Sequence, residues 1–147
     1  MASPDTWTPR FRLRLDDQDL AAVRRWAAGA YPNEACGLLI GAAGAEGLRV
    51  VEVREARNVE PDRTTDRYTL DPGAVHAADR DARSSGLDIL GFWHSHPDSP
   101  AIPSQTDRTR AWGGYAYVIV SVRTGRVGEI RAWTLEDGAF QEGRIVS

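Results

Sequence analysis

The sequence has little cysteine, no long apolar run and no excess of positive charge, and each shortage excludes a class of protein. Its single cysteine, Cys36, rules out a disulfide within the chain and favours the reducing cytoplasm. No apolar stretch approaches the length of a transmembrane helix, and the first residues lack the core of a secretory signal, so we expect no membrane association. A net charge of −3 gives no electrostatic footprint for nucleic acid.

Several familiar catalytic motifs are also missing. There is no His-Glu-x-x-His, which defines the common zincins, and no Cys-x-x-Cys, which the cytidine deaminases need to bind zinc. Cys36 could be a nucleophile paired with a distant histidine, but its place in an apolar run favours a small buried side chain. We interpret His76, which is surrounded by alanine and charged residues on an expected helix, as a solvated surface residue.

What the sequence does contain is a cluster of metal-capable side chains. It reads His94-Ser-His96, then seven residues, then Ser104, two further residues and Asp107. The apolar run 87–93 before it predicts a buried strand, on which positions i and i+2 share a face roughly 6.6 Å apart. The proline-rich stretch that follows predicts a stiff loop, and a loop that swings back would bring Asp107 to the two imidazoles.

Two imidazole nitrogens, one carboxylate and an open fourth position compose a catalytic zinc site rather than a closed structural one. We therefore expect one Zn²⁺ per chain, held by His94, His96 and Asp107. Asp98 is an alternative oxygen ligand, although its place in the loop ranks it behind Asp107. Ser104 with Asp107 also matches a capping box, so Ser104 can begin a helix while its hydroxyl faces the cavity.

Together with Glu34 upstream, this motif resembles the signature of the JAMM (MPN+) zinc metalloproteases. Glu34 lies in the segment Tyr31-Pro-Asn-Glu-Ala-Cys-Gly-Leu-Leu-Ile-Gly41, at a junction between an expected helix and an expected strand. The resemblance implies that Glu34 binds the zinc water, accepts its proton and passes that proton to the departing amine. In the same mechanism Ser104 would donate a hydrogen bond to the oxyanion of the tetrahedral intermediate of amide hydrolysis.

The expected fold is an α/β layered MPN domain, with a mostly antiparallel central sheet flanked by helices and cytidine-deaminase-like layering. We expect residues 11–147 to form a single domain and residues 1–10 to form a loose tail. The hydrophobic patterns predict strands over 11–15, 35–41, 48–55, 87–94, 115–122, 129–135 and 140–146, and helices over 17–30, 71–85 and 104–112.

The resemblance also implies a substrate class. JAMM enzymes cleave amide bonds at the C-terminal tails of ubiquitin-like, β-grasp proteins, and this short chain looks like the compact prokaryotic branch. The expected partner is a sulfur-carrier protein ending in Gly-Gly, from which cysteine or trailing residues are released, a role in cysteine biosynthesis. The alternatives are removal of a small modifier from lysines, a non-catalytic MPN scaffold, and hydrolysis of small amides. We expect the loops 58–70 and 97–103 to line the substrate channel.

Overall fold

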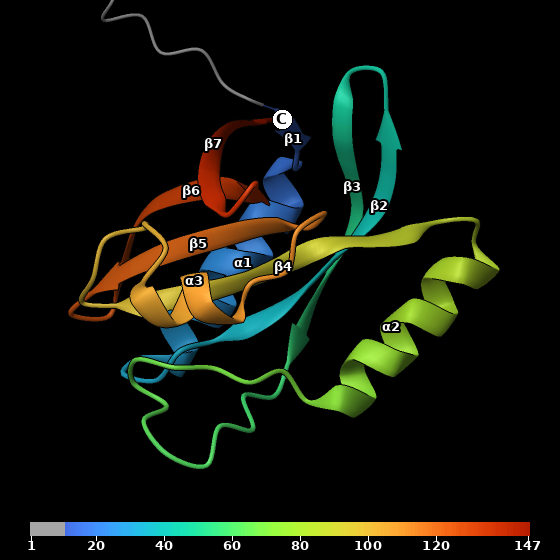
Figure 1. Ribbon diagram of the computed structural model, residues 1–147. Helices are drawn as coiled ribbons and strands as arrows, with labels where there is room; N and C mark the ends of the chain where they lie inside the picture. Colours follow the sequence, from blue (N-terminus) through green and yellow to red (C-terminus); the bar gives the residue numbers. More distant parts are fainter. Residues whose placement is uncertain (1–10) are drawn as a thin grey trace, which may run out of the picture.

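The computed structural model describes residues 11–147, in which strands and helices follow one another in the order that the sequence predicts (Figure 1). The elements are β1 (Arg12–Arg14), α1 (Asp17–Ala30), β2 (Cys36–Gly44), β3 (Gly47–Ala56), α2 (Pro72–Ser84), β4 (Asp88–Pro97), α3 (Gln105–Arg110), β5 (Ala116–Arg123), β6 (Arg126–Glu136) and β7 (Ala139–Val146). Each expected element is present, and β4 continues beyond its expected end to Pro97. The expected loose tail, residues 1–10, lies outside the described residues.

The strands of residues 11–147 form one mixed sheet that closes on itself in the order β1-β3-β2-β4-β5-β6-β7. Neighbours are antiparallel between β2 and β3, β2 and β4, β5 and β6, and β6 and β7, whereas β4 and β5 run parallel. The short β1 pairs in parallel with both β3 and β7, and this pairing closes the barrel. The antiparallel majority agrees with the expected fold, while the closure through β1 was not predicted.

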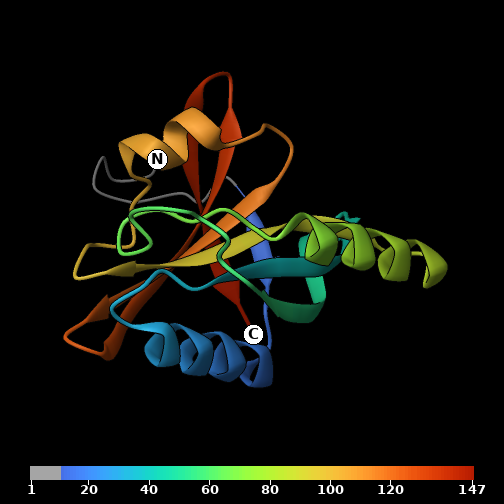
Figure 2. The ribbon, with the colours of Figure 1, turned by 90° about the horizontal axis from the view of Figure 1, so that it is seen from below.

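The central strand β4 is buried on both faces, which explains its continuous apolar run. On one face Trp93 stacks on Trp26 of α1, with 5.8 Å between the ring centroids. On the other face Phe92 packs in a second apolar cluster that includes Ala78 of α2. Figure 2 shows the resulting layers, with α1 on one side of the strands and α3 on the other. The histidines at the end of β4 therefore sit in a rigid, packed strand.

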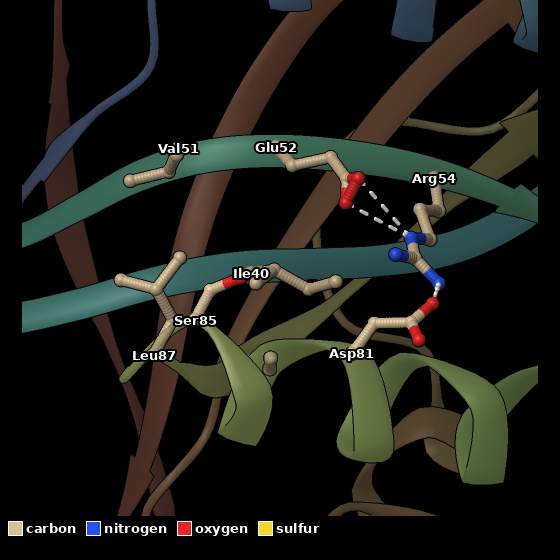
Figure 3. Close-up of a pocket in the computed structure, with 8 residues that line it drawn as sticks. Ile40, Val51, Glu52, Arg54, Asp81, Ser85 and Leu87 are labelled. Atoms are coloured by element: carbon tan, nitrogen blue, oxygen red, sulfur yellow. Dashed lines mark hydrogen bonds and ion pairs between the residues drawn. The ribbon is translucent and has the colours of Figure 1, made fainter.

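Ion pairs between Arg54 of β3 and two carboxylates help to fix α2 on the sheet. The Arg54 guanidinium lies 3.0 Å from Glu52 on its own strand and 3.0 Å from Asp81 on α2, as Figure 3 shows. A pocket of about 460 Å³ between these elements contains none of the expected site residues. None of the helices in residues 11–147 has the length and apolarity needed to span a membrane.

Candidate metal centre

His94 and His96 lie on the same face of β4, as their spacing predicts, and both side chains are buried. Their Nε2 atoms are 3.1 Å apart. Strand β4 is hydrogen-bonded to β2 on one side and to β5 on the other, and its pairing with β5 continues through Pro97. The backbone of His94 is thus paired on both sides and that of His96 with β5, so both rings project from a strand and not from a loop.

Asp107 is brought to the two imidazoles by the short helix α3. Its Oδ2 atom lies 3.2 Å from Nε2 of His94 and 3.0 Å from Nε2 of His96. The proline-rich segment between β4 and α3 therefore swings back as expected. The three side chains that we predicted as ligands converge on one point.

The capping box that competed with this prediction is formed as well. Ser104 is the N-cap of α3, and its Oγ accepts a hydrogen bond from the Asp107 backbone N–H at 3.0 Å. In return, the Ser104 backbone N–H donates to Asp107 Oδ2 at 2.8 Å. The Ser104 hydroxyl acts here as an acceptor, so its own O–H remains available as a donor.

Glu34 lies at the junction between α1 and β2 and reaches the same point from another part of the chain. Its side chain is only 4% exposed, and one carboxylate oxygen lies with ring nitrogens of His94 and His96 in a group whose atoms are all within 4.8 Å of one another. Atom Oε1 of Glu34 has no hydrogen-bond partner among the described residues. The imidazoles therefore face two carboxyl groups, those of Glu34 and Asp107.

Electrostatics distinguish these two carboxyl groups. Burial, together with the charges of Asp107 and Asp66, raises the pKa of Glu34 to about 9, and Arg110 opposes this only in part. Glu34 is consequently protonated at neutral pH in the metal-free protein. A protonated carboxyl is a weak metal ligand but a suitable proton carrier.

Asp107 is pushed in the opposite direction. Burial alone would raise the pKa of Asp107, but the two imidazoles and the Ser104 N–H outweigh it and hold that pKa well below its usual range. Burial also lowers the pKa of His94, against the opposing charge of Asp107, so this imidazole favours its neutral form. An anionic carboxylate beside the neutral His94 imidazole is suited to bind a cation.

The hydrogen bond of His96 shows that these residues fit zinc. Its Nδ1 lies 2.7 Å from the carbonyl oxygen of Pro100, which can only accept, so Nδ1 carries a proton and Nε2 is the nitrogen left to bind a cation. This Nε2 lies 3.0 Å from the Asp107 oxygen, so the two atoms can share one cation. Two imidazoles and a carboxylate are a donor set that suits zinc.

The other candidates from the sequence do not reach this centre. Asp98 accepts hydrogen bonds from the Tyr31 hydroxyl at 2.7 Å and from the Thr124 N–H at 2.8 Å, which ties its carboxylate to other segments. Cys36 is buried, and burial, followed by the charge of Glu34, raises the pKa of its thiol to about 12, so it is no ionised nucleophile. His76 is exposed on α2, as expected.

A pocket of about 790 Å³ opens beside the centre and is lined by both His94 and Asp107. Of the two loops that we expected to form its walls, residues 67–70 and Pro103 contribute. The remaining wall includes five aromatic side chains from segments that we did not predict to take part: Phe92, Trp112, Tyr115, Tyr117 and Phe140. These residues come from β4, β5, β7 and the segment after α3, and only the folded barrel brings them together.

Three residues next to the centre were not singled out in the sequence. The Tyr68 ring stacks on the His94 imidazole, with 4.5 Å between the centroids. Ser95, between the two histidines, points the other way, and its Oγ accepts a hydrogen bond from the Ala35 N–H at 2.8 Å, beside Glu34. Asn58 donates to the Glu34 carbonyl oxygen. No local pattern marks Tyr68 or Asn58, since both lie in a polar stretch without periodicity.

Several known proteins are similar in sequence to this chain over about three quarters of its length. A desampylase of Haloferax volcanii is 40% identical over 115 residues, which cover 76% of this chain and 81% of the relative. A CysO-cysteine peptidase of Mycobacterium tuberculosis is 32% identical over 116 residues, which cover 76% of this chain and 75% of the relative. A probable TtuB-protein conjugate cleaving protease of Thermus thermophilus is 36% identical over 107 residues, which cover 73% of this chain and 65% of the relative.

Solved structures and a family model agree with these relatives. Protein DSY2949 of Desulfitobacterium hafniense superposes with a TM-score of 0.80 at 29% identity, covering 91% of both chains. AF2198, a JAB1/MPN domain protein from Archaeoglobus fulgidus, superposes with a TM-score of 0.53 at 18% identity, covering 92% of this chain and 99% of that one, which supports the fold. Residues 16–136 match the model of the prokaryotic homologs of the JAB domain. The MPN fold expected from the sequence is thereby confirmed, and the chain belongs to the prokaryotic JAB (JAMM/MPN) family.

Proposed function

We propose that this protein is a zinc-dependent peptidase that cleaves the amide bond following the C-terminal Gly-Gly of a ubiquitin-like sulfur-carrier protein, releasing cysteine or trailing residues. The observation that carries the proposal is the convergence of His94, His96 and Asp107 beside the buried Glu34. The relatives support it, because a CysO-cysteine peptidase and a desampylase are among them. We include the cytoplasm in the proposal, because a single unpaired cysteine suits a reducing compartment.

Each residue has a defined task in this proposal. His94, His96 and Asp107 hold one zinc ion, which when bound supplies an acidified water and polarises the substrate carbonyl. Glu34 loses its proton when a cation lies nearby, accepts a proton from the attacking water and delivers it to the departing amine. This transfer needs a carboxyl whose pKa responds to the charge beside it, which the buried Glu34 provides.

Ser104 is suited to stabilise the oxyanion that develops on the substrate carbonyl. Its hydroxyl accepts from Asp107 and still has a free O–H, which can donate to the oxyanion. A single donor of this kind contributes about 3 kcal/mol to transition-state stabilisation. Because the capping box fixes the Ser104 backbone, its hydroxyl needs little reorganisation during the reaction.

The aromatic pocket beside the centre is suited to the tail of the carrier. Its wall, which includes Tyr68 and Trp112, can hold apolar tail residues that precede the Gly-Gly, and it leads to His94 and Asp107. Glycine has no side chain and can pass close to a metal centre where larger residues cannot. Together these features favour a protein tail over a small free amide.

A second candidate is an isopeptidase that removes a small ubiquitin-like modifier from lysine side chains. The probable TtuB-protein conjugate cleaving protease, at 36% identity, favours it. Both reactions cut the bond after Gly-Gly and use the same residues, and they differ only in the amine that leaves. A non-catalytic scaffold would not need the complete set of zinc ligands and proton carrier that this chain brings together.

Intact-mass analysis of two carrier substrates tests these functions. One carries Gly-Gly followed by a single residue, and the other has Gly-Gly joined to a lysine ε-amine of a target protein. We expect the zinc-loaded protein to release the terminal residue, and a chelator or Asp107→Ala to stop the reaction. Cleavage of the lysine conjugate alone would favour the isopeptidase. Bound zinc without cleavage of either substrate would refute the proposed peptidase, and failure to bind zinc would favour a scaffold.

A further inference from the structure

The side-chain amide of Asn58 makes every hydrogen bond available to it, and each one goes to a backbone group. Its Nδ2 donates to the carbonyl oxygens of Glu34 at 3.2 Å and Arg67 at 3.0 Å. Its Oδ1 accepts from the N–H groups of Glu60 at 3.1 Å and Thr69 at 3.0 Å. An asparagine amide has two donor hydrogens and two acceptor lone pairs, so this side chain is fully satisfied.

Two of these bonds enclose Tyr68. Asn58 binds the carbonyl group immediately before Tyr68 and the N–H group immediately after it. The Tyr68 carbonyl oxygen accepts a third bond from Arg110 at 3.0 Å. The backbone around Tyr68 is thus held on three sides, and its ring lies against the His94 imidazole at an interplanar angle of 22°. The orientation of the ring on His94 therefore depends on the Asn58 amide.

Another of these bonds reaches Glu34. The Glu34 carbonyl oxygen accepts from Asn58, and the Glu34 N–H donates to the Thr64 carbonyl oxygen at 2.7 Å. Both backbone groups of Glu34 are therefore fixed by the 58–70 loop. The Glu34 carboxyl has no hydrogen-bond partner at Oε1 among the described residues, so its side chain does not hold itself in place. Backbone bonds from the loop instead fix the position from which the side chain extends.

We propose that Asn58 is a positioning residue, which sets the Glu34 carboxyl and the Tyr68 ring relative to His94. It contacts neither the substrate nor the ion and acts only through those two residues. The inference rests on the proposed function in one respect, namely that Glu34 takes part in hydrolysis. The expected penalty follows from general experience with outer-shell partners of metal sites, whose loss costs about 10- to 100-fold in activity.

The test compares two variants of the full chain that are each expected to lose some stability. Asn58→Asp keeps the size and the accepting oxygen but replaces the NH2 donor with a second oxygen, which repels the carbonyl oxygens of Glu34 and Arg67. Ile145→Ala is the control, because Ile145 is a partly buried residue of β7, a strand that is not adjacent to β4 in the barrel. Both variants lower stability, but only the first is expected to alter the centre.

The first readout is independent of activity and uses the histidine NMR signals of the metal-free protein. The chain has three histidines, and His76 on α2 lines the same pocket as His94, so the unaltered wild-type protein and the Ile145→Ala control serve as references. Protons over the face of an aromatic ring are shielded, so Tyr68→Ala moves the His94 signals downfield. We expect Asn58→Asp to move the His94 signals in the same direction, while Ile145→Ala has no effect on them.

The second readout is steady-state hydrolysis of the carrier substrate at equal zinc content. We expect Asn58→Asp to lower kcat about 10- to 100-fold because it misplaces Glu34, and to raise KM as well because Tyr68 also lines the tail pocket. A purely structural role would lower the melting temperature and leave kcat of the folded protein unchanged, as in the Ile145→Ala control.

Unchanged His94 signals, or a kcat equal to that of the control, would overturn the proposal. If Asn58→Asp does not fold, Asn58→Ala replaces it, because Asn58 is partly exposed and water can enter the space left by its amide. If the wild-type protein hydrolyses no substrate, the proposed function fails, and the NMR comparison still decides whether Asn58 positions Tyr68 against His94.

Discussion

Ser104 and Asp107 hold each other through reciprocal hydrogen bonds, and the Asp107 oxygen that takes part also faces both imidazoles. The Ser104 N–H donates to Asp107 Oδ2 at 2.8 Å, and this atom lies 3.0 Å from His96 and 3.2 Å from His94. The same arrangement of Ser104 and Asp107 thus caps helix α3 and positions a candidate metal ligand. The local preference of the sequence for a capped helix aims the carboxylate at the centre.

We expect Asp107→Ala to lower zinc affinity by more than the roughly 10- to 100-fold typical of outer-shell partners, because it removes an anionic ligand. The matched control is Asp98→Ala, which removes the other candidate carboxylate and breaks only bonds to Tyr31 and Thr124. Competition with a chromophoric chelator measures both affinities. If Asp98→Ala loses zinc and Asp107→Ala keeps it, the ligand assignment is wrong.

We expect Glu34→Gln to retain zinc and to lose about 10²- to 10⁴-fold in kcat, the usual contribution of a general acid–base group. The amide has nearly the same shape, but it cannot accept and return a proton. Glu55→Gln, at an exposed position on β3, is the control and should keep full activity. Turnover by Glu34→Gln near the wild-type rate would show that another group moves the proton.

The stability of the metal-free protein should fall as the pH rises between neutral and about 9. Glu34 has a pKa raised from 4.5 to about 9, so between these values the folded state binds more protons than the unfolded state. The free energy of unfolding then decreases with rising pH. Urea unfolding at pH 7 and pH 9 measures this loss, which Glu34→Gln should reduce. If the free energy of unfolding falls equally with pH in the wild-type protein and in Glu34→Gln, Glu34 does not titrate in this range.

A pair of glycine substitutions tests the packing beneath the centre. The Trp93 indole N–H donates to the Arg54 carbonyl oxygen at 2.9 Å, and a Cβ on Gly37 would lie 1.8 Å from that oxygen and 2.2 Å from the indole nitrogen. Gly37→Ala should therefore cost about 1–3 kcal/mol or more, as overpacking does.

Gly29→Ala is the matched control for this prediction. A Cβ at Gly29, inside α1, meets nothing within 4 Å, so the substitution should stabilise the protein by about 0.5–1 kcal/mol through helix propensity. Thermal unfolding measures both effects. A stable Gly37→Ala protein would show that the strands around Trp93 can separate.

Much of this protein follows from short-range sequence patterns. The i, i+2 spacing puts His94 and His96 on one face of a strand, and the Ser-x-x-Asp spacing caps α3 and turns Asp107 inward. The strands and helices begin and end close to where hydrophobic periodicity, proline and glycine predict. Such features depend on residues that are near one another in the chain, so the sequence determines them without knowledge of the rest of the fold.

Only the tertiary structure determines which residues from distant parts of the chain contact these side chains. Glu34 reaches the histidines because β2 pairs antiparallel with β4 in a register that places Cys36 opposite His94. Tyr68 stacks on His94 from a polar loop that the Asn58 amide binds, and the aromatic side chains of the pocket meet because β4, β5, β6 and β7 are successive neighbours in the barrel. Strand register and closure depend on the summed packing of many distant side chains, which no local pattern in the sequence records.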